Sequence, residues 1–199
     1  MYSKKWHTNL VLTIACLVVL TTTVAADNLS TPDTRFPGGD FTLQSFHGPV
    51  SLKQYRGNVV LLFFGYTSCP DVCPMALSIL SSVFSRLEPE ELGKIKVLFV
   101  SLDPGRDTPE LLSRYTDFFH PNIIGITGQI EIIDQIVDNY GVEYKKKQTP
   151  DSAIGYSISH TPDILVVNGE GQLLRGRIEP ASSREDIVAY LQRLLPLLQ

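Results

Sequence analysis

The fold of this chain is decided by the stretch VVLLFFGYTSCPDVCPMALSILSSVF at residues 59–84. Its first six residues form a continuous apolar run, which is typical of a β-strand covered on both faces. From Met75 to Leu87 the apolar residues recur at helical spacing, which predicts a helix. Between the strand and the helix lies a turn with two thiols four residues apart, Cys69 and Cys73.

Outward from this stretch, strands and helices alternate along the chain, whose 199 residues suffice for one domain with a sizeable core. The expected elements are hairpins over 41–52 and 164–174, strands over 59–64, 95–102 and 123–127, and helices over 75–87, 108–119, 129–140 and 183–195. This order predicts an α/β fold with a central mixed sheet flanked by helices. With its N-terminal hairpin and its antiparallel hairpin after the βαβ core, it outlines a thioredoxin-like domain over 41–199.

The N-terminal segment has the pattern of a targeting sequence. Lys4 and Lys5 precede an apolar stretch over 10–20, and small residues follow up to Ala26. This predicts that residues 1–26 are a cleaved signal peptide or an N-terminal membrane anchor, because the uncharged stretch approaches the roughly 20 residues that span a bilayer. Either alternative places the rest of the chain outside the cytoplasm, in the periplasm or tethered to the outer face of the inner membrane.

The segment between this leader and the first strand is polar and contains proline. Residues 27–40 are therefore expected to form a flexible lead that spaces the domain from an anchor. The formal net charge of the chain is −4, which gives no reason to expect a nucleic-acid partner. The membrane is expected to contact only the N-terminal segment.

The cysteine content indicates chemistry rather than a structural framework. The chain has three cysteines, and Cys16 leaves with the leader if the leader is cleaved. The remaining pair, Cys69 and Cys73, is not the multi-bridge pattern that holds small secreted domains together. A disulfide that closes so short a loop restricts the unfolded chain little.

The turn that carries the two thiols enters a helix. Pro74 is expected at the first helical position, which places Cys73 at the N-terminus, where the helix dipole favours thiolate over thiol. A four-residue step rises about 6 Å even in a helix, within the Cα separation that a disulfide tolerates. A reversible disulfide and two thiolates converging on one metal ion are therefore both open.

A stable soft-metal site needs a third ligand, and one histidine stands in a suitable place. His160 precedes the predicted strand over 164–167. In thioredoxin-like folds the loop before this strand ends in proline and packs against the cysteine turn; Thr161-Pro162 takes that place, with a cis peptide bond as one alternative. His160 can instead be a histidine bonded to backbone at a strand edge. His47 and His120 are expected to be turn and cap residues.

Three segments together resemble the Sco/SenC family. They are FFGYTSCPDVCP at residues 63–74, VSLDPGRDTP at residues 100–109, and His160 ahead of a strand. The resemblance runs from about Phe41 to the C-terminus. It implies a membrane-anchored or secreted thioredoxin-like copper protein associated with cytochrome c oxidase assembly.

By that resemblance the metal ligands are Cys69, Cys73 and His160. Two thiolates and one imidazole suit Cu(I) and can also hold Cu(II). Zinc is the chemical competitor, because a Cys₂His set with an open fourth position also binds zinc. The chain departs from the family at Ser159, where an acidic residue is frequent, and at Thr161-Pro162, which is more similar to thiol oxidoreductases.

These observations predict a copper-binding accessory protein that delivers copper to cytochrome c oxidase or matures its copper site. Its expected partner is the oxidase subunit that holds the copper site, or another copper protein. The alternative is a thiol-disulfide oxidoreductase in which Cys69 and Cys73 form the redox-active pair and reduce partner cysteines. That alternative adds a thiol-disulfide reductant as a partner. A copper or redox sensor is a third hypothesis.

Overall fold

The computed structural model of the protein describes residues 29–149 and 155–198. The predicted leader, residues 1–26, lies outside the described residues. Within the two described ranges, no helix combines the length and the apolar character needed to cross a bilayer.

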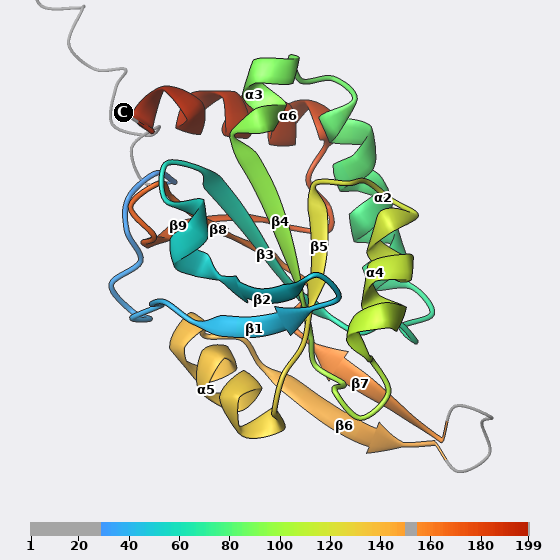
Figure 1. The fold of residues 1–199 in the computed structure, drawn as a ribbon. Helices are drawn as coiled ribbons and strands as arrows, with labels where there is room; N and C mark the ends of the chain where they lie inside the picture. Colours follow the sequence, from blue (N-terminus) through green and yellow to red (C-terminus); the bar gives the residue numbers. More distant parts are fainter. Residues whose placement is uncertain (1–28, 150–154, 199) are drawn as a thin grey trace, which may run out of the picture.

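The centre of the domain is a five-stranded sheet in the order β5-β4-β3-β8-β9 (Figure 1). Its strands are β3 (Val59–Gly65), β4 (Ile95–Ser101), β5 (Ile123–Ile126), β8 (Ile164–Val167) and β9 (Leu173–Ile178). Strands β3, β4 and β5 are parallel, whereas β8 and β9 are antiparallel to their neighbours, so the sheet is mixed as predicted. Every residue of β3 is buried, as its continuous apolar run predicts.

Helices flank this sheet, and all except the short α3 correspond to helices that the sequence predicts. They are α2 (Val72–Phe84), α3 (Pro89–Gly93), α4 (Pro109–Asp117), α5 (Ile130–Tyr140) and α6 (Arg184–Leu194), with 3₁₀ turns η1 (Leu52–Tyr55) and η2 (Leu195–Leu197). Helix α2 packs against α6, and α4 packs along β5. The Thr108 side chain caps α4, and Gly141 ends α5 in the left-handed region at φ 63°.

Helix α2 begins earlier than the sequence predicts. It starts at Val72, so Pro74 is its third residue rather than its first. A proline is tolerated there because the first N–H groups of a helix have no intrahelical acceptor. Cys73 therefore lies within the first helical turn.

The N-terminal hairpin forms as predicted and crosses in front of the sheet in Figure 1. It consists of β1 (Thr42–Ser45) and β2 (Gly48–Ser51). Reciprocal backbone hydrogen bonds of 2.7 and 2.9 Å between Gln44 and Thr127 join β1 to the segment after β5. The hairpin is thus tied to the end of the sheet from which the cysteine turn also leaves.

A further hairpin is a finding that the sequence pattern does not predict. Strands β6 (Tyr144–Gln148) and β7 (Tyr156–His160) pair antiparallel and extend away from the central sheet in Figure 1. The sequence of β6 is YKKKQ, which lacks the apolar alternation of a half-buried strand. His160 consequently ends a strand instead of lying in a loop. The described residues contain no cis peptide bond, so Thr161-Pro162 is trans.

The predicted flexible lead differs from the structure in its described part. The Arg175 N–H donates to the Thr31 carbonyl (2.9 Å), the Asp33 N–H to the Leu173 carbonyl (2.7 Å), and the Gly38 N–H to the Asn139 carbonyl (2.9 Å). Because β9 is an edge strand, its outward backbone groups need partners, and the lead supplies them. Part of the segment predicted as a flexible lead is thus hydrogen-bonded to the domain in the described residues.

This docked lead predicts a pH-dependent contribution to stability. The Asp33 carboxylate is buried and accepts from the Arg35 guanidinium at 2.7 and 2.9 Å, which lowers the Asp33 pKa to about 2. Since the folded-state pKa lies below the unfolded value, the stabilisation is present above about pH 4 and is lost as the pH falls through 2. We expect Asp33→Asn to reduce the free energy of unfolding by about 1–2 kcal/mol at pH 6, because solvent around Arg35 screens the pair.

Urea denaturation at pH values between 2 and 6 measures this difference. Arg35→Gln is the matched variant, because it removes the same ion pair by replacing the other partner. Its difference in stability from the wild type should also shrink as the pH falls towards 2. A difference between wild type and Asp33→Asn that stays constant from pH 6 to pH 2 would contradict the prediction.

Candidate metal centre

Three side chains from separate elements converge at the end of β3. The sulfurs of Cys69 and Cys73 and a ring nitrogen of His160 all lie within 4.8 Å of one another. The Sγ of Cys73 is 3.5 Å from the Nε2 of His160. Over the described residues, this is the one group of at least three histidine, cysteine or acidic side chains with ligand atoms so close. The structure thus brings together the three residues that the sequence singles out.

Cys73 is the most deeply buried member of the group, with no exposed surface. Its sulfur occupies space left by Gly65 at the end of β3. A Cβ atom on Gly65 would lie 2.8 Å from this sulfur and 2.7 Å from the ring of Phe99. Gly65 is therefore part of the site, although the sequence analysis did not identify it.

Cys69 lies in the turn before α2, where its N–H donates to the Tyr66 carbonyl at 3.2 Å. The interaction with the neighbouring Cys73 thiol is the largest cause that lowers the pKa of Cys69, and it outweighs burial, which acts in the opposite direction. The same interaction, together with burial, raises the pKa of Cys73. Cys69 is therefore the more acidic thiol of the pair.

The orientation of His160 leaves one ring nitrogen available. Its Nδ1 lies 2.9 Å from the Thr161 carbonyl oxygen, which can only accept, so we assign the proton to Nδ1. The Nε2 then presents a lone pair toward the thiols, as in histidines that bind metals through this nitrogen. The rings of Phe63 and Tyr66 lie edge-on to the imidazole at centroid distances of 6.3 and 6.2 Å.

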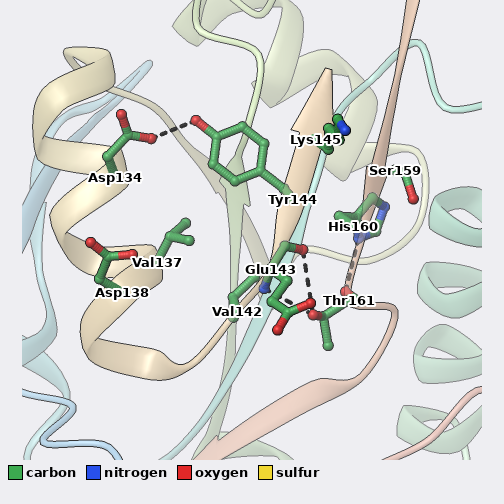
Figure 2. Close-up of a pocket in the computed structure, with 10 residues that line it drawn as sticks. All are labelled: Asp134, Val137, Asp138, Val142, Glu143, Tyr144, Lys145, Ser159, His160 and Thr161. Carbon is green, nitrogen blue, oxygen red and sulfur yellow. Dashed lines mark hydrogen bonds between the residues drawn. The ribbon is translucent and has the colours of Figure 1, made fainter. Parts of the chain in front are cut away.

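A cavity of about 810 Å³ lies beside His160, between α5 and the β6–β7 hairpin (Figure 2). Three carboxylates line it, from Asp134, Asp138 and Glu143, and the Tyr144 hydroxyl donates to Asp134. Neither cysteine is among its lining residues. Of the three-residue group, His160 alone lines this cavity.

A buried carboxylate supports the cysteine turn from behind. The N–H and the hydroxyl of Thr67 donate to Asp107 at 3.1 and 2.6 Å, and the Ser101 hydroxyl donates to it at 2.6 Å. Asp107 is only 1% exposed. Asp107 lies in the segment over residues 100–109, but its residue type and position predicted no role for it. The sequence held no local signal for this role, because Asp107 contacts a turn that lies 40 residues earlier in the chain.

The other two histidines of the described residues lie apart from this group. The Nδ1 of His120 accepts from the Asn122 N–H at 3.1 Å, and its ring packs on Phe84. His47 is exposed in the turn between β1 and β2. Neither belongs to the cluster of ligand atoms.

The converging group has the chemistry of a soft-metal site. Ligand atoms about 2.0–2.3 Å from an ion lie roughly 3.5–4 Å from one another in a trigonal or tetrahedral arrangement. The separations of up to 4.8 Å therefore need only small side-chain rotations to close around an ion. Two sulfurs and an imidazole favour a soft or borderline metal ion over magnesium or calcium.

Comparison with known proteins gives a match over most of the chain. The family model described as SCO1/SenC matches residues 30–196. The mitochondrial protein SCO2 of Saccharomyces cerevisiae is 34% identical over 164 residues. That alignment covers 78% of this chain and 54% of the yeast protein, so the chain spans about half the length of this relative.

Solved structures show the same fold. The apo Sco1 protein from Thermus thermophilus is 38% identical, with a TM-score of 0.73 over 84% of this chain and 96% of that one. ScoI of Bradyrhizobium japonicum, solved with copper bound, is 34% identical, with a TM-score of 0.71 over 79% of this chain and 99% of that one. These similarities agree with the thioredoxin-like fold that the sequence predicts.

Proposed function

Because the chain belongs to the SCO1/SenC family, we propose that it is a copper-binding accessory protein for the copper site of cytochrome c oxidase. Its ligands are Cys69, Cys73 and His160. The observation that carries this proposal is the convergence of their three ligand atoms within 4.8 Å. The similarity to ScoI of Bradyrhizobium japonicum, whose structure holds copper, supports the choice of metal over zinc.

Each residue of the set has a separate task in this proposal. Cys69 and Cys73 supply thiolates, which suit Cu(I) and also tolerate Cu(II). His160 supplies Nε2, and its Nδ1–H bond to the Thr161 carbonyl fixes the direction of the ring. Because His160 lines the neighbouring cavity, a ligand of the acceptor protein would approach the set beside His160.

The proposed compartment follows from the N-terminal pattern. A leader over 1–26 would place the domain in the periplasm or an equivalent compartment, released there or tethered to the membrane. The acceptor would be the oxidase subunit that holds the copper site, or another copper protein. The mass of the mature protein and its membrane fractionation test the proposed compartment.

A thiol-disulfide oxidoreductase is the second candidate, and the approach of the Cys69 and Cys73 sulfurs to within 4.8 Å of each other is the observation that favours it. The Cys69 thiolate would attack a partner disulfide, forming a mixed disulfide and releasing one partner thiolate. Cys73 would then attack the Cys69 sulfur, which releases the second partner thiol. The partner gains two electrons, Cys69 and Cys73 become a disulfide, and a dithiol reductant restores them.

Replacing His160 separates the two candidates. We expect His160→Ala to weaken Cu(I) binding about 100-fold or more, because even residues that only orient ligands contribute 10–100-fold. Reduction of a partner disulfide needs only the two thiols and should persist in this variant. Competition with a chromogenic Cu(I) chelator measures the first quantity, and a disulfide-reduction assay measures the second.

His47→Ala is the matched control, because His47 is an exposed histidine outside the cluster and its loss should leave both quantities unchanged. Wild-type protein that fails to bind one Cu(I) per chain tightly would rule out the copper proposal. Normal disulfide reduction in that same protein would then favour the oxidoreductase.

A further inference from the structure

One short loop contacts both elements that carry the proposed ligands. This loop, residues 103–107, follows β4 and precedes α4. On one side it meets the turn that leads to Cys69 and Cys73. On the other side it meets the β6–β7 hairpin, which ends at His160.

The first attachment is made by Asp107. Its carboxylate accepts the N–H and the hydroxyl of Thr67, two residues before Cys69. A carboxylate that accepts several hydrogen bonds in the interior fixes the groups that donate to it, because losing any of them leaves a buried charge without a partner. Asp107 therefore determines where the cysteine turn lies relative to β4.

The second attachment is made by Asp103 and Arg106 through Tyr156 of β7. The Tyr156 hydroxyl donates to Asp103 Oδ1 at 2.7 Å, and the Arg106 guanidinium donates to Asp103 Oδ2. Arg106 also donates to the Tyr156 carbonyl at 3.3 Å and lies 3.7 Å from the centre of its ring. Both the backbone and the side chain of Tyr156 are thus held by the loop.

The loop itself is closed by hydrogen bonds. The Asp103 carbonyl accepts from the N–H groups of Arg106 and Asp107 at 3.0 and 2.9 Å, and the Asp103 N–H donates to the Ser101 hydroxyl at 3.0 Å. Asp103 is 4% exposed. The two carboxylates therefore occupy fixed positions relative to each other and to the end of β4.

We infer that the 103–107 loop is a positioning element that sets the separation between the thiol pair and His160. Asp107 fixes the thiol side, and Asp103 with Arg106 fixes the imidazole side through Tyr156. This inference rests on the proposed ligand set. It explains how a hairpin with an exposed, polar outer strand keeps the ring of His160 3.5 Å from the Cys73 sulfur.

Tyr156→Phe tests this role because it removes only the hydroxyl that Asp103 accepts. We expect it to weaken Cu(I) binding about tenfold, as changes in residues that orient ligands do. In a His160→Ala background the same substitution should change the affinity by less than about twofold, because Tyr156 acts through His160. The reduction potential of the Cys69–Cys73 pair should not move in either background.

The measurement is competition for Cu(I) against chelators of graded affinity, so that weak binding by His160→Ala remains measurable. Tyr140→Phe is the matched control, because it also removes a tyrosine hydroxyl bonded at 2.7 Å, to the Gly39 carbonyl, away from the site. An unchanged affinity in Tyr156→Phe overturns the inference. An equal loss of Cu(I) affinity on Tyr156→Phe in the wild-type and His160→Ala backgrounds also overturns it.

A measurement on the metal-free protein tests the role of the loop independently of whether the protein binds copper. If wild-type protein does not bind Cu(I), the copper proposal fails, and amide hydrogen exchange decides about the loop. The Ile158 N–H donates to the Tyr66 hydroxyl, across the join between the hairpin and the cysteine turn. Tyr156→Phe should speed exchange of this amide about tenfold relative to wild type, as local opening becomes easier. Unchanged exchange overturns the inference.

Discussion

Replacing Cys73 with serine is expected to abolish tight Cu(I) binding and partner reduction together. The hydroxyl is a hard oxygen ligand, whereas the thiolate is the soft ligand that Cu(I) prefers. The loss of affinity should exceed about 100-fold, because residues that merely orient ligands already contribute up to that factor. Without Cys73, a mixed disulfide formed at Cys69 has no second thiol to resolve it.

Three measurements check this expectation: Cu(I) competition, a disulfide-reduction assay, and the mass of the adduct that Cys69 forms with a small disulfide. Cys73 is fully buried, so the stability of the metal-free variant is measured alongside. Cys69→Ser provides the companion variant, with its sulfur nearer the surface and the same expected loss of copper binding. Wild-type Cu(I) affinity in folded Cys73→Ser protein would remove Cys73 from the ligand set.

The centre of the fold could be predicted because its signals are local. The apolar run over 59–64 specifies a strand buried on both faces, and it is the middle strand of the sheet. The cysteines directly after it must lie at the end of that strand. The strand Ile164–Val167 pairs with β3, which brings the residues before it, including His160, to the same place.

What the sequence did not reveal depends on contacts between distant residues. The β6 strand carries three consecutive lysines, so its pairing with β7 leaves no apolar pattern to detect. Asp107 has the composition of an ordinary turn residue, and only the tertiary structure shows that it is buried under Thr67. The lead was predicted to be flexible because its composition is polar, whereas Leu29, Thr31 and Asp33 form backbone hydrogen bonds with the edge strand β9.

Gly65→Ala is expected to have the second large effect on stability and Cu(I) binding, because even an added methyl group should disrupt the site. Replacing glycine with alanine in a strand normally stabilises a protein by about 0.4–1 kcal/mol, because it restricts the unfolded chain. At Gly65 the added methyl group would lie 2.8 Å from the Cys73 sulfur and 2.7 Å from the Phe99 ring. Both neighbours are fully buried and cannot move away freely, so the sign should reverse.

Gly65→Ala is therefore expected to lower the free energy of unfolding by about 1–3 kcal/mol, the usual cost of overpacking. Because the displaced atom is the Cys73 sulfur, Cu(I) affinity should also fall. Gly93→Ala is the control, since a Cβ there meets nothing within 4 Å and should be neutral or mildly stabilising. Urea denaturation and Cu(I) competition on both variants measure the two effects. Equal stability of the two variants would mean that the space at the end of β3 accommodates a methyl group beside the sulfur.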